Sequence, residues 1–183
     1  MTREDALQLV KERVKNDNLV KHMLAVEAVM KALAQKLSQN QDDWALAGLL
    51  HDADYEETKD QMARQGVVIA GELRQKGMSD EICHAIMAHN EATGTQRESM
   101  MDKAIYATDP LTGLIIASTL VLPSKKLSDL TTANVLNRFK EKSFAKGARR
   151  DAIELCQQIN LTLEEFVDIG LKAMQEISDD LGL

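Results

Sequence analysis

A histidine and an aspartate stand side by side where an apolar run of the chain ends. Residues 44–50 (WALAGLL) carry no charge, and His51 and Asp52 follow directly, with further acids at Asp54 and Glu56. Imidazole nitrogens and carboxylate oxygens suit divalent first-row metals, whereas the two cysteines lack zinc-finger spacing. His51 and Asp52 can reach one ion only where the backbone turns, which the sequence HDADY permits. These residue types therefore indicate metal chemistry at this point.

Three further histidines lie in the first half of the chain, at His22, His84 and His89. A lone histidine beside an apolar stripe is more often a hydrogen-bonded boundary residue than a ligand. His84 and His89 are five residues apart, about 140° around a helix, so both cannot face one site. Asp109 precedes Pro110, and such a pair is also typical of a helix N-cap followed by proline at the first helical position. The residues alone leave the capping and ligand interpretations of Asp109 open.

Four stretches in order resemble the HD superfamily of metal-dependent phosphohydrolases. They are His22, GLLHDADYE at 48–56, AIMAHNE at 85–91 and AIYATDPLTGLI at 104–115. The pattern of that superfamily is a histidine, an adjacent His-Asp pair and a distant aspartate, all on helices of one all-α domain. The resemblance covers roughly residues 18–122, and the rest of the chain resembles the tail of a small bacterial branch of the superfamily.

The resemblance implies that His22, His51, Asp52 and Asp109 bind a metal, so it favours the ligand interpretation of Asp109. One divalent ion is expected, and the donor set leaves Mn, Fe, Co, Ni, Mg and Zn open. Such an ion would polarise a phosphoryl oxygen and lower the pKa of a bound water. Asp52 is expected to orient that water, with Asp54 and Glu56 as proton acceptors. For these last two, a solvated acidic turn is an equally good interpretation.

His89 needs separate treatment, because binuclear members of the superfamily bind a second metal through extra histidines between the His-Asp pair and the last aspartate. His89 resembles the later of these histidines. The earlier one would stand four residues before Gly66, where this chain has Met62. The resemblance therefore implies one metal, with His89 as a substrate-phosphate or water contact or a weak extra ligand. His84 is expected to be a structural or surface residue.

A basic segment stands out in an otherwise acidic chain. Residues 138–150 carry six lysines and arginines and a single acid, Glu141. A phosphorylated substrate needs positive charge besides the metal, so Lys142, Lys146 and Arg149 are expected to bind substrate phosphate. The alternative is a solvated basic face.

These residues predict a phosphomonoesterase or phosphodiesterase that acts on a nucleotide or another small phosphorylated molecule. Two alternatives remain. A diiron oxygenase on the same helices would require the histidine that is missing at Met62. A non-catalytic metal or nucleotide sensor would keep the scaffold without turnover, although the complete ligand set speaks against it.

The elements that must position these residues are helices. The fold expected is an all-α bundle of roughly eight helices in a single domain, because Ala, Leu, Met, Gln, Glu and Lys are abundant and turn residues are few. An apolar stripe with steps of three and four runs over 19–37, and the run 44–50 is apolar on every side, which indicates a buried helix. A further helix is expected over 57–76, and Asp109-Pro110 should break or kink another.

Helix ends are also predicted. Ser79 is an expected N-cap, and capping boxes are expected at Ser99 with Asp102 and at Thr162 with Glu165. Gly48, one turn before His51, should let its helix pack closely against a neighbour, so that the ligands at the helix end are held rigidly.

Bulk properties limit the classes of protein. With 183 residues and 44% apolar side chains, one domain is expected, divided into a metal-binding part at 1–125 and a C-terminal helical extension at 126–183 packed on it. A net charge of −7 argues against nucleic acid as a partner. No run is long and apolar enough for a membrane span or an export signal, so the cytoplasm is expected and no membrane partner. The oligomeric state is left open.

Overall fold

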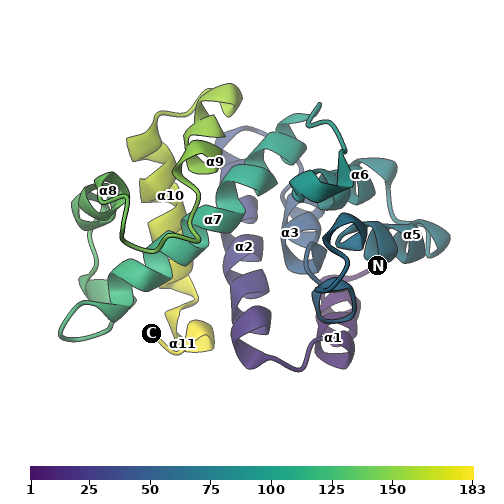
Figure 1. Ribbon diagram of the computed structural model, residues 1–183, viewed down its shortest axis with the longest axis horizontal. Helices are drawn as coiled ribbons and strands as arrows, with labels where there is room; N and C mark the ends of the chain where they lie inside the picture. The colour runs from purple at the N-terminus through teal and green to yellow at the C-terminus, as the bar shows by residue number, and fades with distance from the viewer.

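All regular structure in the chain is helical. The computed structural model describes residues 1–183, with eleven α-helices, four short 3₁₀-helices and no strand (Figure 1). Eight of the α-helices have nine residues or more, so the predicted all-α bundle of roughly eight helices is confirmed. No helix is at once long enough and apolar enough to cross a membrane.

The longer helices are α1 (Arg3–Arg13), α2 (Asp17–Lys36), α3 (Gln41–Leu50), α5 (Val67–Gln75), α6 (Asp80–Ala88), α7 (Met100–Leu120), α8 (Thr132–Lys140) and α10 (Leu163–Glu176). The short ones are α4 (Tyr55–Thr58), α9 (Arg150–Glu154) and α11 (Ser178–Leu181), and the 3₁₀-helices are η1 (Met62–Arg64), η2 (Glu91–Thr93), η3 (Leu127–Asp129) and η4 (Leu155–Ile159).

Helices α2 and α3 form the most extensive pair in the fold. The expected stripe of α2 is buried, and α3 is buried on nearly every side, with Trp44, Leu49 and Leu50 in the core. Helices α7 and α10 pack on α2 from the other side, so one hydrophobic core extends from Ala6 to Leu181 and includes the C-terminal segment (Figure 1).

Gly48 is the point of closest approach between α3 and α2. A Cβ added to Gly48 would lie 2.9 Å from the Cα and N atoms of Glu27 and from the carbonyl oxygen of Val26. All three are backbone atoms, which cannot move aside as a flexible side chain would. The expectation that Gly48 permits close helix packing is therefore confirmed.

The caps expected from the sequence are present. Ser79 caps α6, and reciprocal capping boxes join Ser99 with Asp102 at the start of α7 and Thr162 with Glu165 at the start of α10. These side chains satisfy N–H groups that the first turn of a helix leaves without partners.

Two expectations about helix ends are wrong. The helix expected over 57–76 is interrupted: α4 ends at Thr58 and α5 begins only at Val67. Gly66 lies between them with φ of +84°, in the left-handed region that favours glycine, and a Cβ there would lie 2.7 Å from the carbonyl oxygen of Ile86. The turn at Gly66 is imposed by the contact with Ile86 of α6. The helical periodicity of the sequence therefore does not predict it.

The expected break at Asp109-Pro110 is also absent. Helix α7 begins at Met100 and continues through Pro110 to Leu120. Asp109 therefore lies in the middle of a helix, and its interpretation as an N-cap is excluded. The proline forgoes one hydrogen bond, and burial of α7 between its neighbours outweighs that loss.

We expect Gly48→Ala to destabilise the fold by about 1–3 kcal/mol, because the added methyl group would force α2 and α3 apart. Gly71→Ala in α5 is the matched control, since no atom lies within 4 Å of its Cβ position. That control should be neutral or more stable by up to ~1 kcal/mol. Urea unfolding measures both, and equal stability of the two variants would show that the close contact is unimportant.

Candidate metal centre

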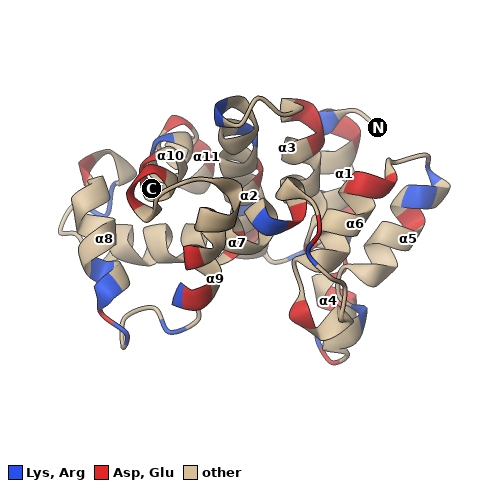
Figure 2. Cartoon of the chain, turned by 90° about the horizontal axis from the view of Figure 1, so that it is seen from above, with Lys and Arg blue, Asp and Glu red and all other residues tan.

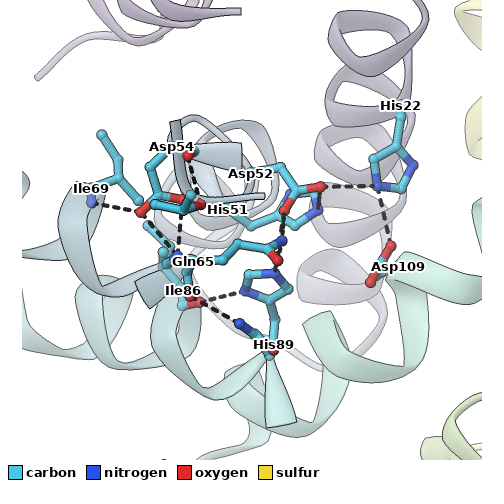
Figure 3. Close-up of polar contacts among 12 residues, drawn as sticks. His22, His51, Asp52, Asp54, Gln65, Ile69, Ile86, His89 and Asp109 are labelled. Atoms are coloured by element: carbon cyan, nitrogen blue, oxygen red, sulfur yellow. Dashed lines mark hydrogen bonds and ion pairs between the residues drawn. The ribbon is translucent and has the colours of Figure 1, made fainter. Parts of the chain in front are cut away.

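The four expected ligands come together from three helices. His22 lies on α2, His51 and Asp52 directly follow α3, and Asp109 lies on α7 (Figure 3). His22 Nε2 is 3.1 Å from Asp109 Oδ1 and 3.9 Å from Asp52 Oδ2, while His51 Nε2 is 3.5 Å from Asp52 Oδ2. One ligand atom each from His22, His51 and Asp52 lies within 4.8 Å of the other two. This spacing suits coordination of a single ion.

Backbone carbonyls fix the orientation of two imidazole rings. His51 Nδ1 lies 2.8 Å from the carbonyl oxygen of Gly48, and His89 Nδ1 is hydrogen-bonded to the carbonyl oxygen of Ile86. A carbonyl only accepts, so in each ring Nδ1 carries the hydrogen and the neutral ring has its lone pair on Nε2. Both Nε2 atoms are therefore in the form that binds a metal or accepts a hydrogen bond.

Thr112 gives His22 the same tautomer by a different route. The Thr112 hydroxyl donates to the carbonyl oxygen of Asp109 at 2.9 Å, so its lone pair accepts from His22 Nδ1, 3.2 Å away. The Nε2 lone pair of His22 then faces Asp109 Oδ1. Two electron-rich atoms 3.1 Å apart need a proton or a cation between them. Sequence analysis missed Thr112, although it stands one turn after Asp109, where helix geometry brings it alongside.

Burial and neighbouring charges shift the pKa values of the cluster in different directions. Burial lowers the pKa of His51, which favours the neutral ligand form, and His51 Nε2 is buried without a hydrogen-bond partner. Burial alone would raise the pKa of Asp52, but the surrounding histidines, His51 foremost, hold it well below its ordinary value. Burial would lower the pKa of His22, and the neighbouring Asp109 carboxylate raises it instead. Two carboxylates and an unpartnered imidazole nitrogen fit a divalent ion.

Gln65 occupies the other side of Asp52. Its Nε2 donates to Asp52 Oδ1 at 2.5 Å and lies 3.5 Å from His89 Nε2, which is itself 3.4 Å from Asp52 Oδ1. His89 is thus in the cluster, where its role as a phosphate or water contact stays a prediction. Met62, which stands where binuclear members are expected to have a histidine, is 45% exposed on η1. The side chain beside His89 is instead the neutral amide of Gln65. Sequence analysis missed Gln65, because a single glutamine carries no pattern.

Asp54 is engaged with the backbone at the start of α5. Both of its carboxylate oxygens accept the backbone N–H of Gly66 at 2.9 Å, and Oδ2 also accepts from Ile69 at 2.9 Å. Burial raises the pKa of Asp54, and these N–H groups oppose that rise. The carboxylate caps the start of α5, and Figure 3 draws its contact with the backbone N–H of Ile69.

Glu56 is likewise engaged elsewhere. Its Oε1 accepts the backbone N–H groups of Lys15 at 2.9 Å and Asn16 at 2.8 Å, in the turn between α1 and α2. Both carboxylates, Asp54 and Glu56, thus hold backbone segments in place, and their role as proton acceptors stays a prediction.

The basic segment divides into residues with different surroundings. Lys142 and Lys146 are exposed, with no ion pair that would direct them to the cluster. Figure 2 shows basic residues on the segment that follows α8. Arg149 instead binds Glu91 at 2.7 Å. Arg150, which was not singled out, donates to six backbone carbonyls between residues 138 and 148 and organises the loop.

His84 lies outside the cluster, as expected. Its Nδ1 is 3.1 Å from Asp102 Oδ2, which also accepts the backbone N–H groups of Glu98 and Ser99. His84 thus contributes to the start of α7 and leaves the metal centre to the other three histidines.

Comparison with known proteins gives one match. The family model described as HD domain matches residues 19–118, more than half of the chain. The matched region contains all four expected ligands together with Gln65 and His89. No curated protein and no solved structure gives a significant match.

We expect His51→Ala and Asp52→Ala each to abolish stoichiometric binding of a divalent metal, because each removes a ligand atom from the cluster. His84→Ala is the control and should retain the metal. Elemental analysis of the purified proteins measures this, and full occupancy in Asp52→Ala would refute the ligand assignment.

Asp109→Asn should keep the fold, because the residue lies within α7, yet it should weaken metal affinity strongly by removing an anionic oxygen. Thr112→Val should weaken it about 10–100-fold, since His22 loses the group that fixes its tautomer. Competition with a chromogenic chelator measures both affinities. A Thr112→Val variant that binds metal like the parent would show that the hydroxyl does not orient His22.

Proposed function

The chain belongs to the HD domain family, and on that premise we propose that it is a metal-dependent phosphohydrolase. The expected substrates are phosphate monoesters or diesters, a nucleotide or another small phosphorylated molecule. The observation that carries the proposal is the convergence of two Nε2 lone pairs, from His22 and His51, on the carboxylates of Asp52 and Asp109.

His22, His51, Asp52 and Asp109 would hold the ion. When bound, a divalent ion supplies a Lewis acid for a phosphoryl oxygen and makes hydroxide available from water near neutral pH.

The residues around these ligands determine how the ligand atoms are presented. Gln65 donates to Asp52 Oδ1, which leaves Oδ2 directed at His22 and His51 and fixes the plane of the carboxylate. Asp52 is thereby positioned to hydrogen-bond a water at the centre, as a nucleophile requires. His89 Nε2, beside Asp52 Oδ1, offers a further polar atom for that water or for a phosphoryl oxygen.

The surroundings of His89 also bear on the diiron alternative. A second ion needs its own ligands, and the residue nearest to His89 and Asp52 is the neutral amide of Gln65. An amide N–H directed at Asp52 Oδ1 competes with a second ion for that oxygen. The arrangement therefore supports a single ion over a diiron centre.

We expect metal-dependent turnover when nucleotides, cyclic nucleotides and sugar phosphates are tested with Mn²⁺, Mg²⁺, Co²⁺ and Ni²⁺. Inorganic phosphate release detects monoester cleavage, and chromatography detects the monoester formed from a diester. Asp52→Ala is the inactive control. Two bound irons with oxygen consumption would favour the oxygenase instead, and bound metal without any turnover would favour a sensor.

A further inference from the structure

A second polar cluster, formed by Glu91, Arg97, Tyr106 and Arg149, lies beside the metal centre. The Cζ atoms of Arg97 and Arg149 are 3.8 and 4.8 Å from the centroid of the Tyr106 ring. The Glu91 carboxylate accepts the Tyr106 hydroxyl and an Arg149 N–H at 2.7 Å, and Arg97 Nη2 is 4.0 Å from it. We call these four residues the Tyr106 cluster.

Two members of the Tyr106 cluster are close in sequence to residues of the metal centre. Tyr106 stands three residues before Asp109 on α7, so the two are neighbours on one face, roughly 4.5 Å apart along the helix axis. Glu91 follows His89 by two residues. Helix α9, which begins directly after Arg149, packs on α7 and brings that arginine to the same place (Figure 1).

The two arginines have unused capacity to bind an anion. The Arg97 side chain forms no hydrogen bond, and its ion pair with Glu91 is long, at 4.0 Å, although the side chain is only 27% exposed. Arg149 has one hydrogen-bonded carboxylate and is 40% exposed. The adjacent Arg150 is different, because six carbonyls satisfy it. The N–H groups of Arg150 are thus taken up by the backbone, whereas Arg97 and Arg149 keep free N–H groups.

Glu91 occupies the place that an external oxyanion would take. Its carboxylate accepts a phenolic O–H and a guanidinium N–H, which are also the donors that phosphate prefers. The Glu91 side chain is 54% exposed, so it can turn into solvent when another oxyanion takes over its two donors. Two guanidinium groups face one carboxylate, which leaves an excess positive charge. Tyr106 is 2% exposed, so its ring cannot stack with a base, and the cluster suits an anion instead.

We propose that Arg97 and Arg149 form an anion subsite for a second phosphate group of the substrate, while the first phosphate lies at the metal centre. The substrate class is then a small molecule that carries two phosphate groups. Glu91 holds the arginines in the absence of that group and is displaced by it. The inference rests on the proposed phosphohydrolase function for the role of the site, but anion binding can be measured without turnover.

The test is calorimetric titration of the metal-loaded protein with inorganic pyrophosphate. Arg97→Gln and Arg149→Gln should each weaken binding about tenfold or more, because each removes charge-assisted hydrogen bonds. Glu91→Gln should strengthen binding several-fold, because the competing carboxylate is gone. A purely structural cluster predicts the opposite for Glu91→Gln, which would lose ion pairs and gain no affinity.

Arg138→Gln is the matched control, because Arg138 also pairs with a carboxylate, Glu141 at 2.9 Å, and lies over a ring, Phe144 at 5.0 Å. It should bind pyrophosphate like the parent. Metal content and thermal unfolding are measured for every variant, and Arg97→Lys and Arg149→Lys, which keep the charge, replace any glutamine variant that does not fold.

The subsite is refuted if the parent does not bind pyrophosphate, or if the arginine variants bind it as the parent does. Turnover of a substrate with one phosphate group tests the phosphohydrolase separately. If the parent shows no turnover of that substrate but binds pyrophosphate through the two arginines, the proposed function is rejected and the anion subsite is kept.

Discussion

The contact between α3 and α2 at Gly48 is the constraint on which the candidate metal centre depends. Helix α3 ends at Leu50, directly before His51, and its closest approach to α2 lies one turn before His51, against the backbone of Glu27. His22 stands on α2, so the distance between the two helices sets the distance between two ligands that are far apart in sequence. Gly48 also supplies the carbonyl that holds the His51 ring. A larger residue at this position would disturb the helix contact and the ligand geometry together.

A second constraint is the requirement that buried polar groups have partners. Asp54 and Glu56 follow the ligands in sequence and have the chemistry of proton acceptors, but backbone N–H groups that no helix satisfies take up their oxygens. Arg150 meets the same requirement for the carbonyls of the loop after α8. Two of the proposed functional groups show the reverse condition. His51 Nε2 is buried without a partner, and Arg97 makes no hydrogen bond.

The environment of Asp52 links these constraints to chemistry. One of its oxygens is directed at His22 and His51, and the other is held by Gln65 next to His89. Positive charge on the surrounding histidines holds the pKa of this buried carboxylate low, and a bound cation would supply the same charge with the histidines neutral. The polar groups that border the site on the α7 side carry positive charge, which suits a substrate that brings negative charge of its own.

The sequence by itself determined the helical fold class, the buried run before His51, the caps at Ser79, Ser99 and Thr162, and the need for a glycine at Gly48. These are local properties, since periodicity, capping and side-chain size act within a few residues. The resemblance of the spaced motifs to the HD superfamily also predicted the four expected ligands, which the structure brings together.

Only the tertiary structure decided the course of α7 through Pro110, the turn at Gly66 and the roles of Gln65, Thr112 and Arg97. Each of these depends on a partner from another segment: the neighbours that bury α7, the Ile86 carbonyl, Asp52, His22 and Tyr106. Such partners approach through packing over long sequence separations, and no pattern of spacing along the chain encodes which side chains then meet.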